Sequence, residues 1–280
     1  MDFENQIYTA DSRALNVRSV VREMFYGLLR SRYPAYRIAW REIKSQYSQS
    51  ALGIFWDFVD PLILGLVFYF LRNSNVFTTG ETSMPYSIYI IFGLLLFQMF
   101  ADATLQTTTI MTTSRQLLQH QKLYPEVMLL SVFFQVMFFS FFKIAVMLGF
   151  AFATGAFSLV GLLKFILLYP AIILAGLAIG TLLAPFNAIY RDVGRFVRMI
   201  ILPARFLSPV LFVFPDTLFY RVLVLGNPFA LILNNLRLLA VTNTVVDVLP
   251  MLVHCVVLLV IGLVGWFIFH LSVPIIADRA

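Results

Sequence analysis

The sequence predicts an all-α integral membrane protein, on two observations of composition and one of pattern. Apolar residues make up 60% of the 280 positions, charged residues only 12%, and the mean hydropathy is +0.88. Soluble globular domains are less apolar and carry about twice that share of charge. Six apolar runs also approach the roughly 20 residues that a helix needs to cross a bilayer. We expect a six-span domain at residues 53–280, with spans at 54–71, 86–105, 127–152, 162–189, 196–214 and 248–276.

The segment before the first span, residues 1–52, is basic and aromatic. It has no short apolar core followed by a cleavage site, so we expect no signal peptide to be removed. Large side chains recur there at spacings of three and four, which predicts one face of an amphipathic helix in the lipid headgroup plane, aromatic face toward the membrane. These residues are Tyr36, Trp40, Ile43 and Tyr47, with Arg37, Arg41 and Lys44 on the opposite side.

The few charges inside the predicted spans need polar surroundings. Asp57 and Asp60 open the first span, where helix N-terminal amides favour carboxylates. Asp102 in the second span and Arg205 in the fifth are expected at matching depths, which would allow an ion pair between them. Lys143 in the third span has no acidic partner at its expected level and is predicted to extend toward the outer surface.

Two further patterns concern packing. Small residues at a spacing of four predict close helix contacts within one subunit. They are Ala145, Gly149 and Ala153 in the third span and Gly176, Gly180 and Ala184 in the fourth. Residues 215–244 are too apolar for a solvated loop, yet Pro215, Gly226 and Pro228 divide them into pieces too short to span. We therefore predict an external re-entrant or interfacial hairpin beside a pathway.

Lys and Arg residues are distributed unevenly between the two sides of the predicted spans. Eight precede Gly53, and more follow in the connections after the second and fourth spans and in the tail. The other side receives only Arg221 and Arg237. Because cytoplasmic flanks carry the excess of basic residues, we expect both termini in the cytoplasm. The net charge of +6 then reflects membrane topology, and we expect no nucleic-acid partner.

The sequence lacks motifs for catalysis and nucleotide binding. It contains no G-x-x-x-x-G-K-[ST] loop, no H-E-x-x-H and no nucleophile elbow. His120, His254 and His270 are too dispersed for a recognisable metal site, and we interpret the last two as packing or interface residues. We expect no enzymatic activity, metal or cofactor in this chain. Cys255 is expected to be a small buried thiol.

The stretch REIKSQYSQSALGIFWDFVDP, which joins the basic segment to the first span, resembles the N-terminal signature of the permease subunits of ABC-2-type polysaccharide exporters. The family pattern is a basic residue, then Lys, then an aromatic residue, followed by Ser-x-Leu-Gly-x-x-Trp and a Pro five residues on. These places are held by Arg41, Lys44, Tyr47, Ser50, Leu52, Gly53, Trp56 and Pro61.

Later segments are similar to the family as well. LLQHQKLYPEV resembles the loop between spans two and three, although Glu126 follows Pro125 directly, one position earlier than in the commoner arrangement. NAIYRDV resembles the turn after span four. FLSPVLFVFP and LGNPFALILNNLR resemble the segments that flank the re-entrant region.

The resemblance implies a homodimer of six-span subunits joined to two separate ATPase subunits that bind Mg-ATP. Such permeases move lipid-linked O-antigen, capsular or teichoic-acid polymers across the bacterial inner membrane. A coupling helix at residues 113–127 would dock on the ATPase, and spans one and five of both subunits would form the channel. The residues implied in coupling are Arg115, His120, Lys122, Pro125, Glu126, Arg191 and Asp192. Those implied at the substrate entry and channel are Trp40, Tyr47, Trp56, Asp57, Phe58 and Arg205.

The sequence leaves four alternatives open. Aromatic rings pack against the C–H faces of sugars, so Trp40, Tyr47 and Trp56 allow glycan binding as well as plain membrane anchoring. An ABC-2 permease for a drug or lipid is the nearest alternative to a polymer exporter, and the Ser-x-Leu-Gly-x-x-Trp signature favours the polymer. An integral acyltransferase using His254 or His270 and a stand-alone secondary transporter are more distant alternatives.

Overall fold

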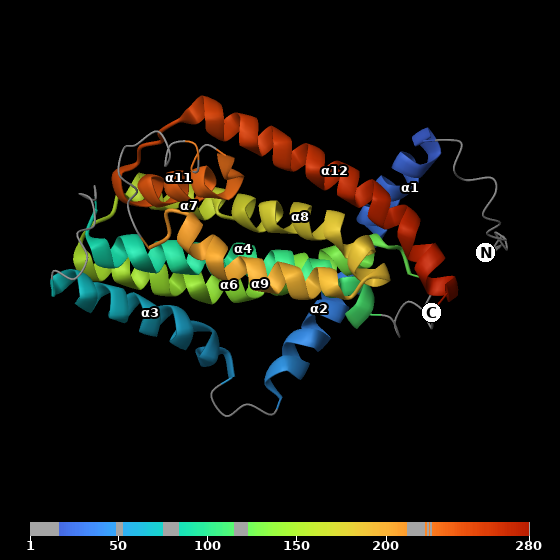
Figure 1. Ribbon diagram of the computed structural model, residues 1–280, viewed down its shortest axis with the longest axis horizontal. Helices are drawn as coiled ribbons and strands as arrows, with labels where there is room; N and C mark the ends of the chain where they lie inside the picture. The colour runs from blue at the N-terminus through green and yellow to red at the C-terminus, as the bar shows by residue number, and fades with distance from the viewer. Residues whose placement is uncertain are drawn as a thin grey trace.

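The computed structural model describes residues 17–48, 53–74, 84–114, 123–211, 222, 224 and 226–279. These residues form helices and connecting turns, with no strand among them (Figure 1). Four helical segments in this part of the chain are long and apolar enough to cross a membrane. They are Tyr86–Thr113, Glu126–Thr154, Leu159–Ile189 and Val248–Ile276. The all-helical class is confirmed, and the apolar helices are compatible with a multi-pass membrane protein.

Helix α4 (Tyr86–Thr113) forms the centre of the bundle, and most of its surface is buried. Helix α8 (Pro170–Ile189) packs along it through Gly176 and Gly180, which have no side chain to separate the two backbones. A Cβ atom on Gly176 would lie only 2.5 Å from the carbonyl oxygen of Phe100. The small-residue prediction is therefore confirmed for this helix.

The matching small residues of α6 (Glu126–Thr154) behave differently. Ala145, Gly149 and Ala153 are exposed, and a Cβ atom on Gly149 would meet no atom within 4 Å. The prediction that they pack within the subunit is therefore wrong. Helix α6 turns another face to the core, with buried residues such as Val132, Val136 and Met147.

Helices α4, α8 and α12 (Val248–Arg279) run in the same direction. Helix α12 lies along α8, because Cβ atoms on Gly262 and Gly265 would approach Ala178 and Leu182 respectively. Helix α7 (Leu159–Leu168) precedes α8, with only Tyr169 between them. Figure 1 shows α1 and the end of α12 at one end of the bundle, with α7 and α11 toward the other.

The N-terminal region forms helices α1 (Val17–Arg30) and α2 (Arg32–Tyr47). Ser31 and three residues of α2, at a regular spacing of four, are buried: Ser31, Ala35, Ala39 and Ile43. Ile43 of the predicted aromatic face is buried, whereas Tyr36 is 54% and Trp40 41% exposed, so contact of this face with the membrane stays a prediction. The rings of Tyr36 and Trp40 flank the contact with α6, edge-on to Phe134 and Phe138 at centroid distances of 6.3 and 5.9 Å.

The direction of these ring contacts places α2 along α6 rather than across it. Tyr36 meets Phe134 and Trp40 meets Phe138, so one turn forward on α2 is one turn forward on α6. Small residues fit this geometry because they let two helix backbones approach closely. The bundle thus incorporates α2 through its small side chains.

Two shorter helices flank the central bundle. Helix α3 (Trp56–Asn73) follows a 3₁₀ turn, η1 (Gly53–Phe55), in which Gly53 has φ 50°, a value that glycine adopts without steric cost. Helix α9 (Asp192–Leu207) follows α8 after a short turn. Both contact α4.

The segment predicted as a hairpin, residues 215–244, is described mainly over its second part. There α11 (Pro228–Thr242) forms one buried helix packed against α7, and the backbone N–H of Ser158 donates to the carbonyl of Ala240 at 3.2 Å. Most of the first part lies outside the described residues, so the hairpin stays a prediction.

Candidate functional site

A buried carboxylate marks the start of α6. Glu126 is the first residue of the helix and its side chain is completely buried. Its Oε1 accepts a hydrogen bond from Trp266 Nε1 at 3.1 Å and lies 2.7 Å from His270 Nδ1. The first turn of a helix favours a carboxylate, and a buried carboxylate needs polar partners. Glu126 therefore connects the beginning of α6 to the final part of α12.

Helix α1 closes over the same carboxylate. A Cβ atom on Gly27 would lie 2.5 Å from Glu126 Oε2, so a larger residue here would displace the carboxylate. The ring of Phe25 lies edge-on to Trp266 with a centroid distance of 5.4 Å. Helices α1, α6 and α12 therefore meet at one point, which we call the Glu126 junction (Gly27, Glu126, Trp266 and His270).

The residues implied in coupling are distributed around this end of the bundle. Arg115, His120 and Lys122 lie outside the described residues. Pro125 and Glu126 begin α6, and burial of Glu126 excludes direct contact of its carboxylate with another protein. Arg191 and Asp192 are exposed at the turn between α8 and α9, where Asp192 Oδ1 lies 3.1 Å from Arg195 Nη1.

The turn between α8 and α9 has a specific local cause. The buried side chain of Asn187, near the end of α8, accepts a hydrogen bond through Oδ1 from the backbone N–H of Gly194 at 2.8 Å. This bond satisfies one of the free amides that every helix has in its first turn. A Cβ atom on Gly194 would lie 2.8 Å from the same oxygen, so a larger residue there would disturb this hydrogen bond.

An ion pair lies within the candidate spans, between α4 and α6. Lys143 Nζ is 2.6 Å from Asp102 Oδ2, and the lysine side chain is only 2% exposed. The predictions that Lys143 extends outward and that Asp102 is level with Arg205 as its partner are therefore wrong. The guanidinium of Arg205 lies over the ring of Phe97, 5.6 Å from its centroid.

The geometry of antiparallel helices explains the pair. Asp102 precedes the end of α4 at Thr113 by eleven residues, and Lys143 follows the start of α6 at Glu126 by seventeen. At 1.5 Å per residue their Cα atoms differ by about 9 Å in height. Each Cβ is inclined toward the start of its own helix, so in antiparallel helices the two side chains lean toward each other. The long lysine side chain spans the remaining distance.

The residues implied at substrate entry are only partly described. The side chains of Tyr47, Asp57, Phe58 and Pro61 lie outside the described part of the chain, as do the whole residues Ser50 and Leu52. Trp56 begins α3 and is 57% exposed. Trp40 on α2 stacks beside Tyr36, and Lys44 Nζ lies 5.5 Å from the Trp40 ring centroid. Trp56 is therefore more exposed than Trp40, which is 41% exposed.

A third polar cluster joins two segments that resemble the exporter family. Ser208 Oγ accepts a hydrogen bond from Asn227 Nδ2 at 2.9 Å. Asn227 Oδ1 accepts hydrogen bonds from the N–H groups of Phe229 and Ala230 and so caps the start of α11. The Ser-Pro and Asn-Pro sequences therefore bind each other directly.

Arg237 completes this cluster. Its side chain is completely buried and donates to the carbonyl oxygens of Pro209 at 3.0 Å and Val210 at 3.5 Å. The guanidinium also lies 3.7 Å from the centroid of the Tyr89 ring on α4. Arg237 thus holds the backbone that follows α9 against the core, a structural task.

Sequence reasoning missed the contacts of several residues. Trp266 and His270 are four residues apart on α12, a spacing that places them on one helix face and could have indicated a shared partner. His254 Nδ1 lies 2.8 Å from the Pro250 carbonyl oxygen of its own helix. Cys255 is exposed, which corrects the expectation of a buried thiol. No group of three or more possible metal ligands occurs among the described residues.

Comparison of the chain with known proteins gives no match, either to a protein-family model or to a curated sequence.

Proposed function

We propose that this chain is the permease subunit of an ATP-driven exporter, which moves a lipid-linked surface polysaccharide from the cytoplasmic side across the bacterial inner membrane. The proposal rests on the ordered resemblance of five segments to polysaccharide permeases. The observation that carries it in the structure is the Glu126 junction. Residues 113–127, which would contact the ATPase, end at the carboxylate that binds α12 and touches α1.

This junction would transmit movement. A displacement of residues 113–127 by the partner ATPase would reach α6 directly and α12 through the two bonds to Glu126 Oε1. It would reach α1 through Gly27, and α2 follows α1 after one residue, Ser31. The basic and aromatic helix at the membrane entrance would then respond to ATP binding without a nucleotide site of its own.

The proposed subunit has six spans, with α3 and α9 as the first and fifth. Both present large apolar side chains outward, which suits contact with lipid or with a second subunit. On α3 these are Ile63, Leu66, Val67 and Phe70, and on α9 they are Phe196, Met199, Ile200, Leu202 and Phe206. In the proposed homodimer, α3 and α9 of each subunit form most of the channel. The outward apolar faces of these two helices would then contact lipid or the second subunit. In this arrangement α11 is one limb of the external re-entrant hairpin.

The orientation follows from the basic residues. Helices α1 and α2 carry seven Arg and Lys residues, and three more lie in the first part of α9 or just before it, at Arg191, Arg195 and Arg198. The positive-inside rule assigns this end to the cytoplasm, together with both termini. Mg-ATP would bind two copies of a separate ATPase subunit there.

Deletion of the gene in its host tests the proposal. Cells are fractionated, and lipid-linked glycan is measured inside them and at the surface, with a strain complemented by the intact gene as the control. Long polymer inside the cells and none at the surface, both reversed by complementation, is the expected result. Normal surface polymer without internal accumulation, in a host with no second exporter, would contradict it and favour export of a lipid or drug-like molecule.

A further inference from the structure

One face of α4 changes character halfway along the helix. In the second half it carries polar side chains at spacings of four, four, three and four, which keeps them on one side of the helix. Each of these residues is at least partly exposed, although the side-chain oxygen Oε1 of Gln98 is buried. We call this set the polar stripe: Gln98, Asp102, Gln106, Thr109 and Thr113. From Thr113 to Gln98 it rises about 22 Å, that is, from the end of the candidate span to its middle.

The first half of the same face is apolar and sealed. Ile88, Ile91 and Leu95 lie in line with the polar stripe and are each at most 5% exposed. Helix α3 covers this part, since a Cβ atom on its Gly65 would lie 3.0 Å from Ile91 Cδ1. Figure 1 shows α3 beside the half of the bundle in which α4 begins. The polar stripe therefore occupies the part of the face that α3 leaves open.

Polar groups in this position require water or polar partners. A charged residue is costly at the centre of a membrane-spanning helix, and such residues face the protein interior or a water-filled space. The side chain of Asp102 is 34% exposed, although most of α4 is buried. Contact with lipid is unfavourable for an exposed carboxylate oxygen, so we expect the exposed part of Asp102 to contact water.

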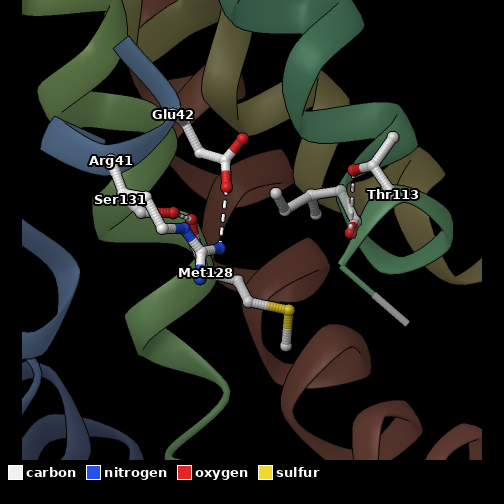
Figure 2. A network of polar contacts seen from close by, with 6 residues as sticks. Arg41, Glu42, Thr113, Met128 and Ser131 are labelled. Atoms are coloured by element: carbon white, nitrogen blue, oxygen red, sulfur yellow. Dashed lines mark hydrogen bonds and ion pairs between the residues drawn. The ribbon is translucent and has the colours of Figure 1, made fainter. Parts of the chain in front are cut away.

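The polar stripe is also electrically balanced. Lys143 neutralises Asp102, and the remaining members are amides and hydroxyls. Figure 2 shows the Thr113 end of α4 together with Arg41 and Glu42 of α2, which form their own ion pair at 2.8 Å. Amides donate and accept hydrogen bonds, and the hydroxyls of Thr109 and Thr113, which donate to carbonyl oxygens of their own helix, can still accept hydrogen bonds from sugar hydroxyls. A surface of this kind fits an uncharged, hydroxyl-rich chain better than a polyanion or a cation.

We propose that the polar stripe of α4 lines a hydrated, electrically neutral passage from the Thr113 end of the helix to mid-membrane, and that the passage accepts an uncharged, hydroxyl-rich chain. The identity of that chain as the exported glycan rests on the proposed function. The hydration and neutrality of the passage do not, and they can be measured separately.

Single cysteines measure hydration. In a Cys255→Ser background, Gln98→Cys, Gln106→Cys and Thr109→Cys are introduced into the complete transporter in membranes open on both sides, and their rates of modification by a charged methanethiosulfonate are compared. The matched control is Phe141→Cys, fifteen residues from the start of α6 as Gln98 is from the end of α4, and 67% exposed on an apolar surface. Leu95→Cys is the buried control on the same face.

Thiols on the polar stripe are expected to react roughly ten-fold faster than either control, because the reactive thiolate forms only where water is present. Loss of one variant through misfolding leaves two others on the same face. Rates no faster than at Phe141→Cys would overturn the passage. Slow labelling together with disulfide-linked dimers would also overturn it, and would show that a second copy covers the polar stripe.

Reagents of opposite charge measure neutrality at Gln106→Cys. After correction for their rates with a small thiol in solution, cationic and anionic reagents are expected to react within about three-fold of each other, because a paired Asp102 adds little field. Adding Lys143→Met is expected to favour the cationic reagent. A ten-fold or larger cationic preference before that change would overturn neutrality. Fast, charge-indifferent labelling in a protein whose deletion leaves surface polymer normal would uphold the passage and contradict only polysaccharide export.

Discussion

Glu126 and His270 are separated by 144 positions in the sequence, yet Glu126 Oε1 lies 2.7 Å from His270 Nδ1 inside the protein. The contact joins the first turn of α6 to α12, and Gly27 of α1 packs against the second oxygen of the same carboxylate. Three helices from distant parts of the chain therefore depend on one side chain.

Replacement of this carboxylate is expected to weaken the whole junction. Glu126→Ala leaves Trp266 Nε1 and His270 without their shared acceptor, which costs about 1–3 kcal/mol for a buried group. The purified protein should unfold at a lower temperature, and trypsin should cut α1 faster at Arg22 and Arg30. Glu42→Ala is the matched control, since Glu42 forms a surface ion pair with Arg41, and such pairs contribute about 0–1 kcal/mol. Equal protection of α1 in both variants would refute the junction.

Lys143 offers a second test of a buried charge. Lys143→Met removes the partner of Asp102 and leaves a partly buried carboxylate uncompensated, so we expect a destabilisation of about 3–5 kcal/mol, reduced by the partial exposure of Asp102. The double variant Asp102→Asn with Lys143→Met should recover much of this loss. Thermal unfolding in detergent measures both. Lys164→Met, which removes an exposed lysine bound to Asn243, is the control and should change little.

The Lys143 pair also shows where sequence reasoning succeeds and fails. The sequence predicts the depth of each residue along its helix, and the predicted depths of Lys143 and Asp102 differ. The direction in which side chains lean, which depends on the helices being antiparallel neighbours, brings them together. Periodicity likewise predicts helix α2, but the face of α2 that is buried depends on the helix it packs against. Close packing on α6 selected Ala35 and Ala39 over the larger Tyr36 and Trp40.

Composition and helix periodicity thus predicted the class of fold and most helices, because both depend on the chain alone. Contacts between helices depend on the partner's surface. Gly176 and Gly149 belong to small-residue patterns with the same spacing of four, yet of these two only Gly176 faces another backbone. The Glu126 junction was missed for the same reason, since His270 has no acidic neighbour along its own helix within two turns.

The two glycine patterns give a matched stability test. Gly176→Ala places a methyl group 2.5 Å from the Phe100 carbonyl oxygen, so α4 and α8 must move apart at a cost of about 1–3 kcal/mol. Gly149→Ala meets no atom and should be neutral or stabilise the helix by up to about 1 kcal/mol. Both changes are measured by thermal unfolding. Equal effects of the two substitutions would contradict the α4–α8 packing.

The last prediction concerns stacking of sugar rings at the proposed substrate entry. The exposure of each tryptophan determines which substitution should have the larger effect. Trp56 is 57% exposed, whereas Trp40 is 41% exposed, with Tyr36 stacked beside it and Lys44 over its ring. If polymer slides over aromatic faces, Trp56→Ala should lower the export rate more than Trp40→Ala. A stacked base or sugar ring contributes about 1–3 kcal/mol by analogy with single-strand binding, so a loss of ten-fold or more is expected.

Rescue separates stacking from assembly. Trp56→Phe keeps an aromatic face and should restore most of the export rate, while Phe55→Ala removes a neighbouring exposed ring that lies in η1. Surface polymer is measured over time in the complemented deletion strain, with membrane levels of each variant matched. Normal export by a fully assembled double variant, Trp40→Ala with Trp56→Ala, would refute stacking on these two residues, because the chain would then move without either indole ring.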